Sequence, residues 1–297
     1  MAGLKPCATD LRLWTVDCRT VDCRTADCRL STVDCRLTVI DSHCHLADDA
    51  FTADLDAVIE RAQAAGLTRA LCILAADNAT ESERARRLVS AWPALRFGIG
   101  LHPHQAGHFS GREPEVVALV RGAIEAVPEA RALGEVGLDY HYDFAPRDVQ
   151  QQVFRLQVRL ARELGLPLVI HTREAEDDTI AILRQESGGA VRGVMHCFTG
   201  TRRLAEEALA LGMHISFAGI VTFPKGANVR DIAPLVPADR LLCETDSPYL
   251  APTPYRGKRN EPAWVTRVAE ELAALRGVPL DDLRRQLAAN FDALFRP

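Results

Sequence analysis

The stretch Thr38-Val39-Ile40-Asp41-Ser42-His43-Cys44-His45-Leu46 is a short run of β-branched residues that ends in two histidines separated by one residue. Side chains alternate between the two faces of a strand, so a strand places His43 and His45 on the same side, whereas a helix separates them. Neutral imidazole is the commonest metal-binding side chain in proteins. Two histidines at one strand end therefore predict half of a metal site.

Beyond this stretch, apolar β-branched runs alternate with amphipathic segments, which is the pattern of βα units around a parallel sheet. Candidate strands lie at residues 37–41, 69–75, 96–101, 131–136, 167–171, 191–196, 213–217 and 240–244. Candidate helices lie at residues 55–65, 82–91, 115–127, 147–164, 174–185, 203–211, 228–235, 263–274 and 280–294. This alternation predicts an α/β fold, a closed (β/α)8 TIM-type barrel, with an open doubly wound sheet as the alternative. The first strand lacks a following Gly-x-Gly-x-x-Gly turn, which counts against a dinucleotide-binding sheet.

Histidines and carboxylates recur where the candidate strands end. Barrels of this type carry their active sites at the C-terminal ends of the strands. The residues at these ends are His43, His45, His102, Glu135, His171, His196 and the run Glu244-Thr245-Asp246. Any one of them alone is as easily a core or loop residue, but their repetition at equivalent positions predicts one shared site. The remaining histidines, His104, His108, His141 and His214, follow no such rule, and we interpret them as loop or surface residues.

Four of these histidines and two of the carboxylates are enough to hold two divalent cations. The predicted metal ligands are His43, His45, Glu135, His171, His196 and Asp246. We expect two metal ions per subunit, with Zn, Mn and Mg as candidates. Glu135 is the natural bridge between them, because no lysine that could form a carboxylated bridge lies at a strand end. A metal-activated water is the expected nucleophile, and Asp246 is placed to orient it and take its proton, so Glu135 and Asp246 are the candidate catalytic residues.

The proline-rich segment after the last candidate strand indicates the class of substrate. It carries Arg256, Lys258 and Arg259 within four residues, in a chain whose formal net charge is -5. Three cations on the catalytic rim of an acidic protein favour phosphate binding. Arg173, just past the fifth strand end, can add a charge-assisted contact to a phosphate oxygen. With His102, these four residues are the predicted substrate contacts.

Six blocks of the sequence carry a family resemblance. They are Asp41-Ser42-His43-Cys44-His45-Leu46, Gly100-Leu101-His102-Pro103, Gly134-Glu135-Val136-Gly137-Leu138-Asp139-Tyr140, His171-Thr172-Arg173-Glu174-Ala175, His196-Cys197-Phe198-Thr199-Gly200 and Glu244-Thr245-Asp246-Ser247-Pro248-Tyr249-Leu250. In this order they resemble the TatD family of metal-dependent deoxyribonucleases within the amidohydrolase superfamily. The resemblance implies a TIM-type barrel with two divalent metals on the six ligands named above. It also implies hydrolysis of DNA phosphodiester bonds, commonly by a 3′ to 5′ exonuclease, so single-stranded DNA is the expected nucleic-acid substrate.

The metal site by itself leaves two other functions open. The same ligands suit a two-metal hydrolase of a small amide, ester or lactone, because a fold does not fix a function. A noncatalytic barrel that binds nucleic acid or a protein is the third hypothesis, and the complete ligand set argues against it. We expect no membrane association and no obligate protein partner.

Residues 1–36 differ in composition from the rest of the chain. They contain near-repeats of Thr-Val-Asp-Cys-Arg, and a five-residue period matches neither a helix nor a strand. We expect a disordered low-complexity N-terminal extension, or a start-site artefact with synthesis beginning near Val33 or Val39, ahead of a hydrolase domain over residues 37–297. The N-terminus lacks the pattern of a signal peptide, and the cysteines of the body lie in or beside apolar runs, which predicts a cytoplasmic protein.

Overall fold

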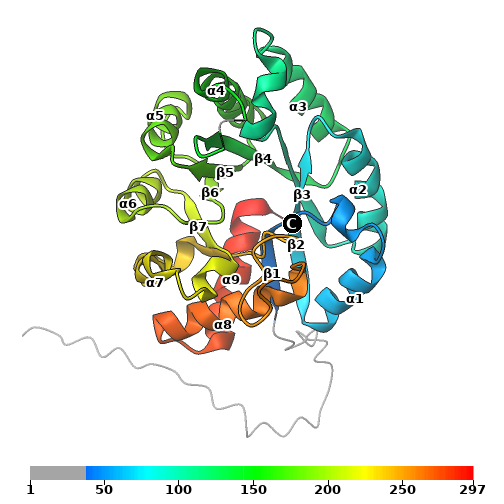
Figure 1. The fold of residues 1–297 in the computed structure, drawn as a ribbon, viewed down its shortest axis with the longest axis vertical. Coiled ribbons are helices and arrows are strands. Elements are labelled where there is room, and N and C mark those ends of the chain that lie inside the picture. The colour runs from blue at the N-terminus through cyan, green and yellow to red at the C-terminus, as the bar shows by residue number, and fades with distance from the viewer. Residues whose placement is uncertain (1–37, 143, 297) are drawn as a thin grey trace, which may run out of the picture. The chain divides into compact units, whose positions relative to one another are not determined.

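The computed structural model describes residues 38–142 and 144–296. In this part of the chain, eight parallel strands alternate with helices to form a nearly closed (β/α)8 barrel (Figure 1). The strands follow one another around the sheet in chain order, from β1 to β8. The predicted TIM-type barrel is thus confirmed. The predicted N-terminal extension lies outside the described residues.

Every candidate strand and helix has a counterpart in the barrel. The strands are β1 (Val39–Cys44), β2 (Leu67–Ala75), β3 (Leu95–Gly100), β4 (Ala130–Asp139), β5 (Leu168–Arg173), β6 (Gly193–Met195), β7 (His214–Phe217) and β8 (Leu241–Cys243). The helices are α1 (Leu55–Ala64), α2 (Ala79–Ala91), α3 (Glu115–Glu125), α4 (Arg147–Leu164), α5 (Glu176–Glu186), α6 (Arg202–Ala210), α7 (Ala227–Ile232), α8 (Val265–Arg276) and α9 (Leu280–Phe295). Among the described helices, none combines the length and the apolar composition needed to cross a lipid bilayer.

Element boundaries differ from the sequence-based expectation at two instructive places. Helix α2 begins at Ala79 because the side chain of Asn78 accepts hydrogen bonds from the backbone nitrogens of Thr80 and Glu81 and so caps the helix. Strand β4 runs on to Asp139, beyond its expected end at residue 136. The longer β4 carries additional polar side chains to the C-terminal end of the barrel.

Small residues let strands β3 and β4 approach each other where β4 carries Glu135. A Cβ atom on Gly100 would lie 2.8 Å from Cγ1 of Val136 and 2.9 Å from Cα of Gly134. Such distances are well inside van der Waals contact, so a larger residue at position 100 would push β4 outward. Glycine at position 100 therefore permits the close approach of β3 to the segment of β4 that carries Glu135.

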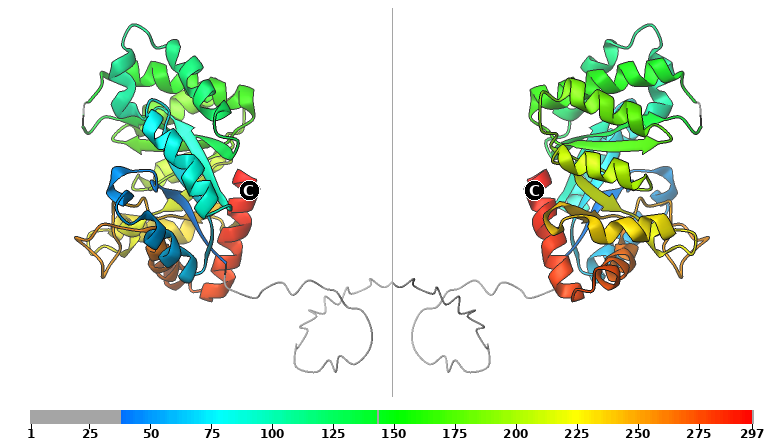
Figure 2. Two further views of the ribbon diagram at one scale, coloured as in Figure 1. Left: turned by 90° about the vertical axis from the view of Figure 1, so that its right-hand side faces the viewer. Right: turned by 90° about the vertical axis from the view of Figure 1, so that its left-hand side faces the viewer.

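Helix α9 packs against the N-terminal end of the barrel (Figure 2). The side-chain amide of Asn290 donates to the backbone oxygen of Leu241, at the start of β8, at 2.8 Å. Asp292 pairs with Arg69, near the start of β2, at 2.6 Å. The ring of Phe291 is fully buried. The helix thus covers the end of the barrel opposite to the one where the polar strand ends gather.

The first and last strands meet in a short seam. Cys44 and Ser247 form an isolated parallel bridge there. The backbone nitrogen of His45 donates to the oxygen of Ser247 at 2.8 Å, and the nitrogen of Asp246 donates to the oxygen of His43 at 2.9 Å. The seam therefore brings residues from the two ends of the barrel chain into contact, and three of them are predicted metal ligands.

Candidate active site

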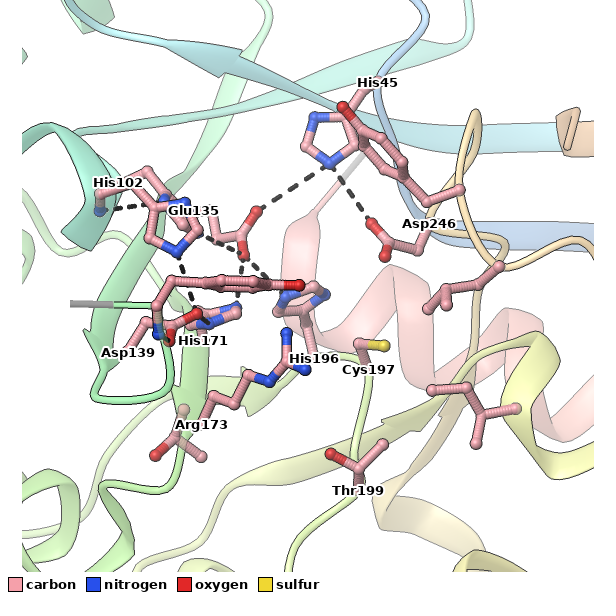
Figure 3. Close-up of a pocket in the computed structure, with 16 residues that line it drawn as sticks. His45, His102, Glu135, Asp139, His171, Arg173, His196, Cys197, Thr199 and Asp246 are labelled. Atoms are coloured by element: carbon pink, nitrogen blue, oxygen red, sulfur yellow. Dashed lines mark hydrogen bonds and ion pairs between the residues drawn. The ribbon is translucent and has the colours of Figure 1, made fainter. Parts of the chain in front are cut away.

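A pocket of about 750 Å³ opens at the C-terminal ends of the strands. The predicted site residues that line it, shown in Figure 3, are His45, His102, Glu135, His171, Arg173, His196 and Asp246. His43 is fully buried, and its ring stacks on that of His196 with centroids 3.9 Å apart. The fold therefore brings all six predicted metal ligands together from five different strands and the residues directly after them.

Ligand atoms on the two sides of the seam form a first group. Nε2 of His43 and Nε2 of His45 lie 3.1 Å apart. Oδ1 of Asp246 lies 3.4 Å from Nε2 of His45 and 3.7 Å from Nε2 of His43. A tetrahedral ion with bonds of about 2.1 Å holds its ligand atoms about 3.4 Å apart. The spacing of this group suits one divalent cation.

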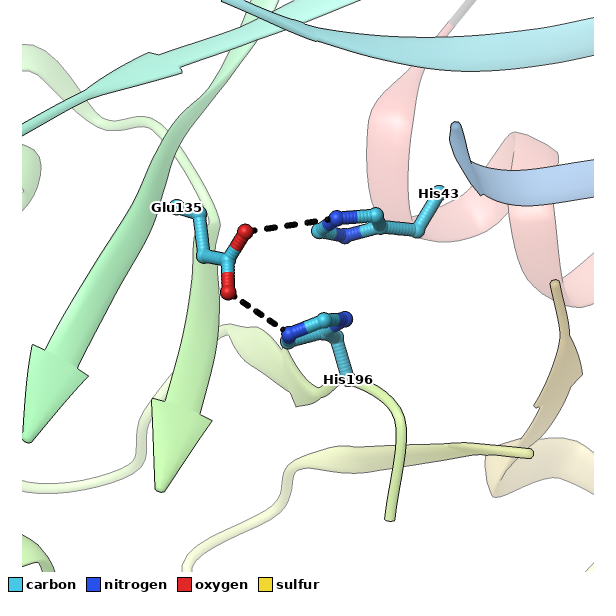
Figure 4. A group of neighbouring side chains, drawn as sticks. All are labelled: His43, Glu135 and His196. Carbon is cyan, nitrogen blue, oxygen red and sulfur yellow. Dashed lines mark ion pairs between the residues drawn. The ribbon is translucent and has the colours of Figure 1, made fainter. Parts of the chain in front are cut away.

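Glu135 connects the first group to a second one (Figure 4). Its Oε2 lies 3.4 Å from Nε2 of His43, in the first group. Its Oε1 lies 2.8 Å from Nε2 of His196 and 3.0 Å from Nδ1 of His171. Nε2 of His102 is 3.4 Å from the same oxygen. Each oxygen of one carboxylate thus faces a different set of histidines, as a ligand that bridges two cations must.

Two further carboxylates hold the ligand histidines in position. Oε1 of Glu244 lies 3.1 Å from Nδ1 of His196, and Oδ2 of Asp139 lies 3.0 Å from Nε2 of His171. A hydrogen bond from one ring nitrogen to a carboxylate fixes the tautomer and leaves the other nitrogen free for a metal. Nε2 of His196 is buried and has no hydrogen-bond partner among the described residues, although Oε1 of Glu135 is 2.8 Å away. The residues present therefore fit a pair of divalent cations.

The ionisable groups of the site shift one another's pKa values. Burial alone would raise the pKa of Glu135, but His196 and His102 hold it well below its ordinary value. Burial alone would lower the pKa of His45, yet Asp246 raises it to about 9. Burial lowers the pKa of His102 to about 4, so its imidazole is neutral. A cation must displace protons from imidazoles such as that of His45, because only the neutral ring binds a metal.

The backbone is in the left-handed region at three non-glycine residues that line the pocket, Cys197, Asp246 and Leu250. The φ angle is 55° at Asp246 and 45° at Cys197. Such conformations cost about 1–3 kcal/mol each and persist where the surroundings hold them. The backbone nitrogen of Cys197 donates to Glu244 at 2.6 Å, and that of Asp246 donates to His43 at 2.9 Å. The backbone hydrogen bond from Asp246 to His43 therefore holds the Asp246 backbone at the seam between β1 and β8.

Of the predicted substrate contacts, His102 and Arg173 belong to the pocket. The guanidinium carbon of Arg173 lies 4.6 Å from the centre of the Tyr142 ring, which also lines the pocket. Figure 3 shows the Arg173 side chain extending into the same space as His171 and His196. Arg173 is thus a cation within the pocket, close to the second group of ligands.

The three loop cations make other contacts. Arg259 pairs with Asp54 at 2.8 Å. The guanidinium carbon of Arg256 lies 3.7 Å from the centre of the Phe223 ring. Lys258 is exposed on the same loop. These three side chains are not among the described residues that line the pocket. They lie outside it.

Sequence reasoning missed several residues that complete the site. Asp139 was not placed in the site, and Glu244 was placed at a strand end without a role, although both are buried and contact predicted ligand histidines. The interpretation of His104 as a loop or surface residue is incomplete, because it lines the pocket and its Nε2 lies 2.9 Å from Oδ2 of Asp139. That interpretation is wrong for His214, which is buried in β7. His108 and His141 are exposed, as predicted.

The chain is similar to known proteins over the whole barrel. A family model described as TatD related DNase matches residues 40–296. The metal-dependent hydrolase YabD of Bacillus subtilis is 39% identical over 255 residues, which cover 86% of this chain and 98% of YabD. The 3'-5' ssDNA/RNA exonuclease TatD of Erwinia billingiae is 38% identical over 258 residues, which cover 85% of this chain and 97% of that protein.

A solved structure has the same architecture. The crystal structure of YJJV, a TatD homologue from Escherichia coli K12, matches with a TM-score of 0.78 at 30% identity, over 89% of this chain and 99% of that one. The family model covers all six predicted metal ligands. The chain therefore belongs to the TatD family and is a metal-dependent hydrolase that acts on ester bonds.

Proposed function

We propose that this protein is a nuclease that removes nucleotides from the 3′ end of single-stranded DNA with the help of two divalent cations, Zn, Mn or Mg. The observation that carries the proposal is the pair of ligand groups joined by Glu135, because a two-metal site spans the attacking and leaving oxygens of a phosphodiester. The printed name of the Erwinia billingiae relative, a 3'-5' ssDNA/RNA exonuclease, supports the choice of substrate.

The metal ligands in this proposal are His43, His45 and Asp246 for one cation, His171 and His196 for the other, and Glu135 for both. Bound there, the cations supply Lewis-acid activation of a water and of the phosphate oxygens. Burial alone would raise the pKa of Asp246, but His45 and His43 hold it below its ordinary value. The Asp246 carboxylate can therefore orient the attacking water and accept its proton.

Arg173 is the proposed contact for the phosphate nearest the cations, because it lines the pocket and its guanidinium group cannot lose its charge at neutral pH. His102 is the second proposed substrate contact, as a neutral imidazole that can donate one hydrogen bond. Arg256, Lys258 and Arg259 are proposed to contact phosphates farther along the strand. Tyr249 and Leu250, earlier in the same loop, line the pocket, which supports this placement.

The proposal involves no protein partner in the reaction, since one chain supplies every ligand. It places the enzyme in the cytoplasm. Among the described residues the cysteines are free thiols, and three of them, Cys44, Cys72 and Cys243, are buried. Such thiols suit a reducing compartment.

The test is an assay with single-stranded DNA labelled at its 5′ end. We expect shortening in single-nucleotide steps that requires a divalent cation and stops on addition of a chelator. Glu135→Ala should abolish the shortening, because it removes a ligand from both cations. Glu163→Ala removes an exposed carboxylate that pairs with Arg121 and serves as the matched control.

Three results would contradict the proposal. Shortening without a divalent cation would exclude a two-metal reaction. Loss of the 5′ label as a mononucleotide in the first step would show the opposite polarity. Failure to cleave any oligonucleotide, together with metal-dependent hydrolysis of a small lactone, ester or amide, would assign the site to a small-molecule hydrolase.

A further inference from the structure

Two stacked aromatic side chains of one loop are exposed beside the pocket, in addition to Tyr249, which is 55% exposed and lines the pocket. Phe144 is 64% exposed and Tyr142 is 48% exposed, both in the loop between β4 and α4. Their rings are nearly parallel, with an interplanar angle of 9° and centroids 5.3 Å apart. Two large rings held in one orientation present a flat apolar surface to solvent. Adjoining exposed aromatic rings at the margin of a pocket are candidates for a binding surface.

Contacts with the site hold this aromatic pair in place. The ring of His104 meets Tyr142 and Phe144 edge-on, with centroids 5.6 Å and 4.8 Å away. Nε2 of His104 lies 2.9 Å from Oδ2 of Asp139, and the same oxygen is 3.0 Å from Nε2 of His171. The pair is thus joined to a proposed metal ligand through two intervening side chains. The side chains of His104 and Asp139 therefore set the position of the aromatic pair relative to His171.

A positive charge accompanies the aromatic pair. The guanidinium group of Arg173 lies against the Tyr142 ring at 4.6 Å, and both residues line the pocket. The pocket therefore offers an anion-binding group, and Tyr142 links this group to the exposed ring of Phe144, which lies just outside the pocket lining. A nucleotide has the matching parts, a phosphate and a planar base. An aliphatic ester or a small lactone has no flat group for the exposed ring.

We infer that Phe144, backed by Tyr142, is a stacking platform for an unpaired base next to the phosphate that is cleaved. Stacking of this kind accepts all four bases, because each has a π face. In a duplex these faces are covered by neighbouring base pairs, so the platform takes single strands or frayed ends. This inference rests on the proposed nuclease function and adds to it a physical origin for the selection of single strands.

The platform predicts a measurable dependence on the base itself. Two oligonucleotides of equal length are compared, one with bases throughout and one with abasic residues at its three terminal positions at each end. The metal-loaded wild-type enzyme should cleave the first with a kcat/KM about 5- to 100-fold higher, mainly through KM. Phe144→Leu should remove this difference. Phe144→Trp, which keeps an aromatic face, should retain it.

Leu235→Ala, which shortens another exposed apolar side chain away from the pocket, is the control and should keep the wild-type ratio. Because Phe144 is exposed, its variants should fold, and thermal unfolding checks this. An equal kcat/KM for the two oligonucleotides in the wild type would overturn the platform, as would a Phe144→Leu enzyme with the wild-type ratio. The platform would also be overturned if Phe144→Leu and Phe144→Trp reduced the ratio of the two kcat/KM values equally. If the wild type cleaves neither oligonucleotide in any divalent cation, the proposed nuclease function itself fails, which is a different outcome.

Discussion

Replacing Asp139 by asparagine should weaken metal binding, because it reverses a hydrogen bond. Oδ1 of Asp139 accepts from the backbone nitrogens of His141 and Tyr142 at 3.0 Å and 3.2 Å, so the amide oxygen of an asparagine would take this position. Its amide nitrogen would then face Nε2 of His171 and Nε2 of His104, which lie 3.0 Å and 2.9 Å from Oδ2. An amide nitrogen donates and does not accept. The variant therefore favours the His171 tautomer that carries its hydrogen on Nδ1.

The size of the effect follows from the position of that hydrogen. Nδ1 of His171 is the atom that lies 3.0 Å from Oε1 of Glu135, where the proposal puts a cation. To bind the cation, the ring must return its hydrogen to Nε2, where it meets the amide hydrogens of the asparagine. Leaving such donors unsatisfied costs about 1–3 kcal/mol. We therefore expect about 10- to 100-fold weaker binding of one of the two cations.

Titration calorimetry of the metal-free protein with Mn²⁺ measures the two affinities, and ¹⁵N chemical shifts of His171 report its tautomer. Asp178→Asn is the matched control. Asp178 accepts hydrogen bonds from Tyr140 at 2.7 Å and from Gln151 at 2.9 Å, so the control makes the same chemical change on a carboxylate that contacts no ligand. Wild-type affinity in Asp139→Asn, with His171 still protonated on Nε2, would refute the reasoning.

Three other predictions follow from the structure. Because the pKa of His45 is raised to about 9 and the pKa values of His171 and His196 are also raised, metal affinity should rise at least about tenfold per pH unit from about pH 7 to 9; affinity independent of pH in calorimetric titrations would contradict this. Lys258→Ala should reduce the slope of log affinity against log salt for single-stranded DNA by about 0.7, and an unchanged slope would remove Lys258 from the phosphate contacts. Phe291→Ala should lower the free energy of unfolding by about 3–5 kcal/mol in urea titrations, because the ring is fully buried under the barrel; a loss below about 1 kcal/mol would show that the cavity collapses.

The convergence of the predicted metal ligands could be expected from the sequence, because a buried barrel strand appears there as an apolar run with a clear end. Leu168-Val169-Ile170 is an apolar run that stops at His171, and the structure places that histidine at the rim. The same reasoning located Glu135, His196 and Asp246. Five strand ends must meet at one rim once the sheet closes, so the convergence follows from topology without knowledge of any distance.

The residues behind the ligands were not predictable in the same way. Asp139 was missed because β4 was expected to end at residue 136, and only the longer strand carries its carboxylate to His171. Glu244 and Asp246 are separated by one residue, and the backbone conformation decides which of them faces the pocket. Arg259 looked like a free cation because its partner Asp54 is 205 residues away in the sequence. Long-range pairing of this kind depends on the tertiary structure.

The seam between β1 and β8 gives the proposed cations a second role. His43 and His45 lie on one side of it and Asp246 on the other, so an ion on this group cross-links the first and last strands much as a disulfide closes a loop. A ligand present at 100 times its Kd stabilises the folded state by about 2.7 kcal/mol. Chelation should therefore speed hydrogen exchange at the amides of His45 and Asp246 more than in the continuous ladder of β2 and β3. An enzyme that loses this ion in the cell would open at the seam and become accessible to proteases, so metal supply would govern its lifetime as well as its activity.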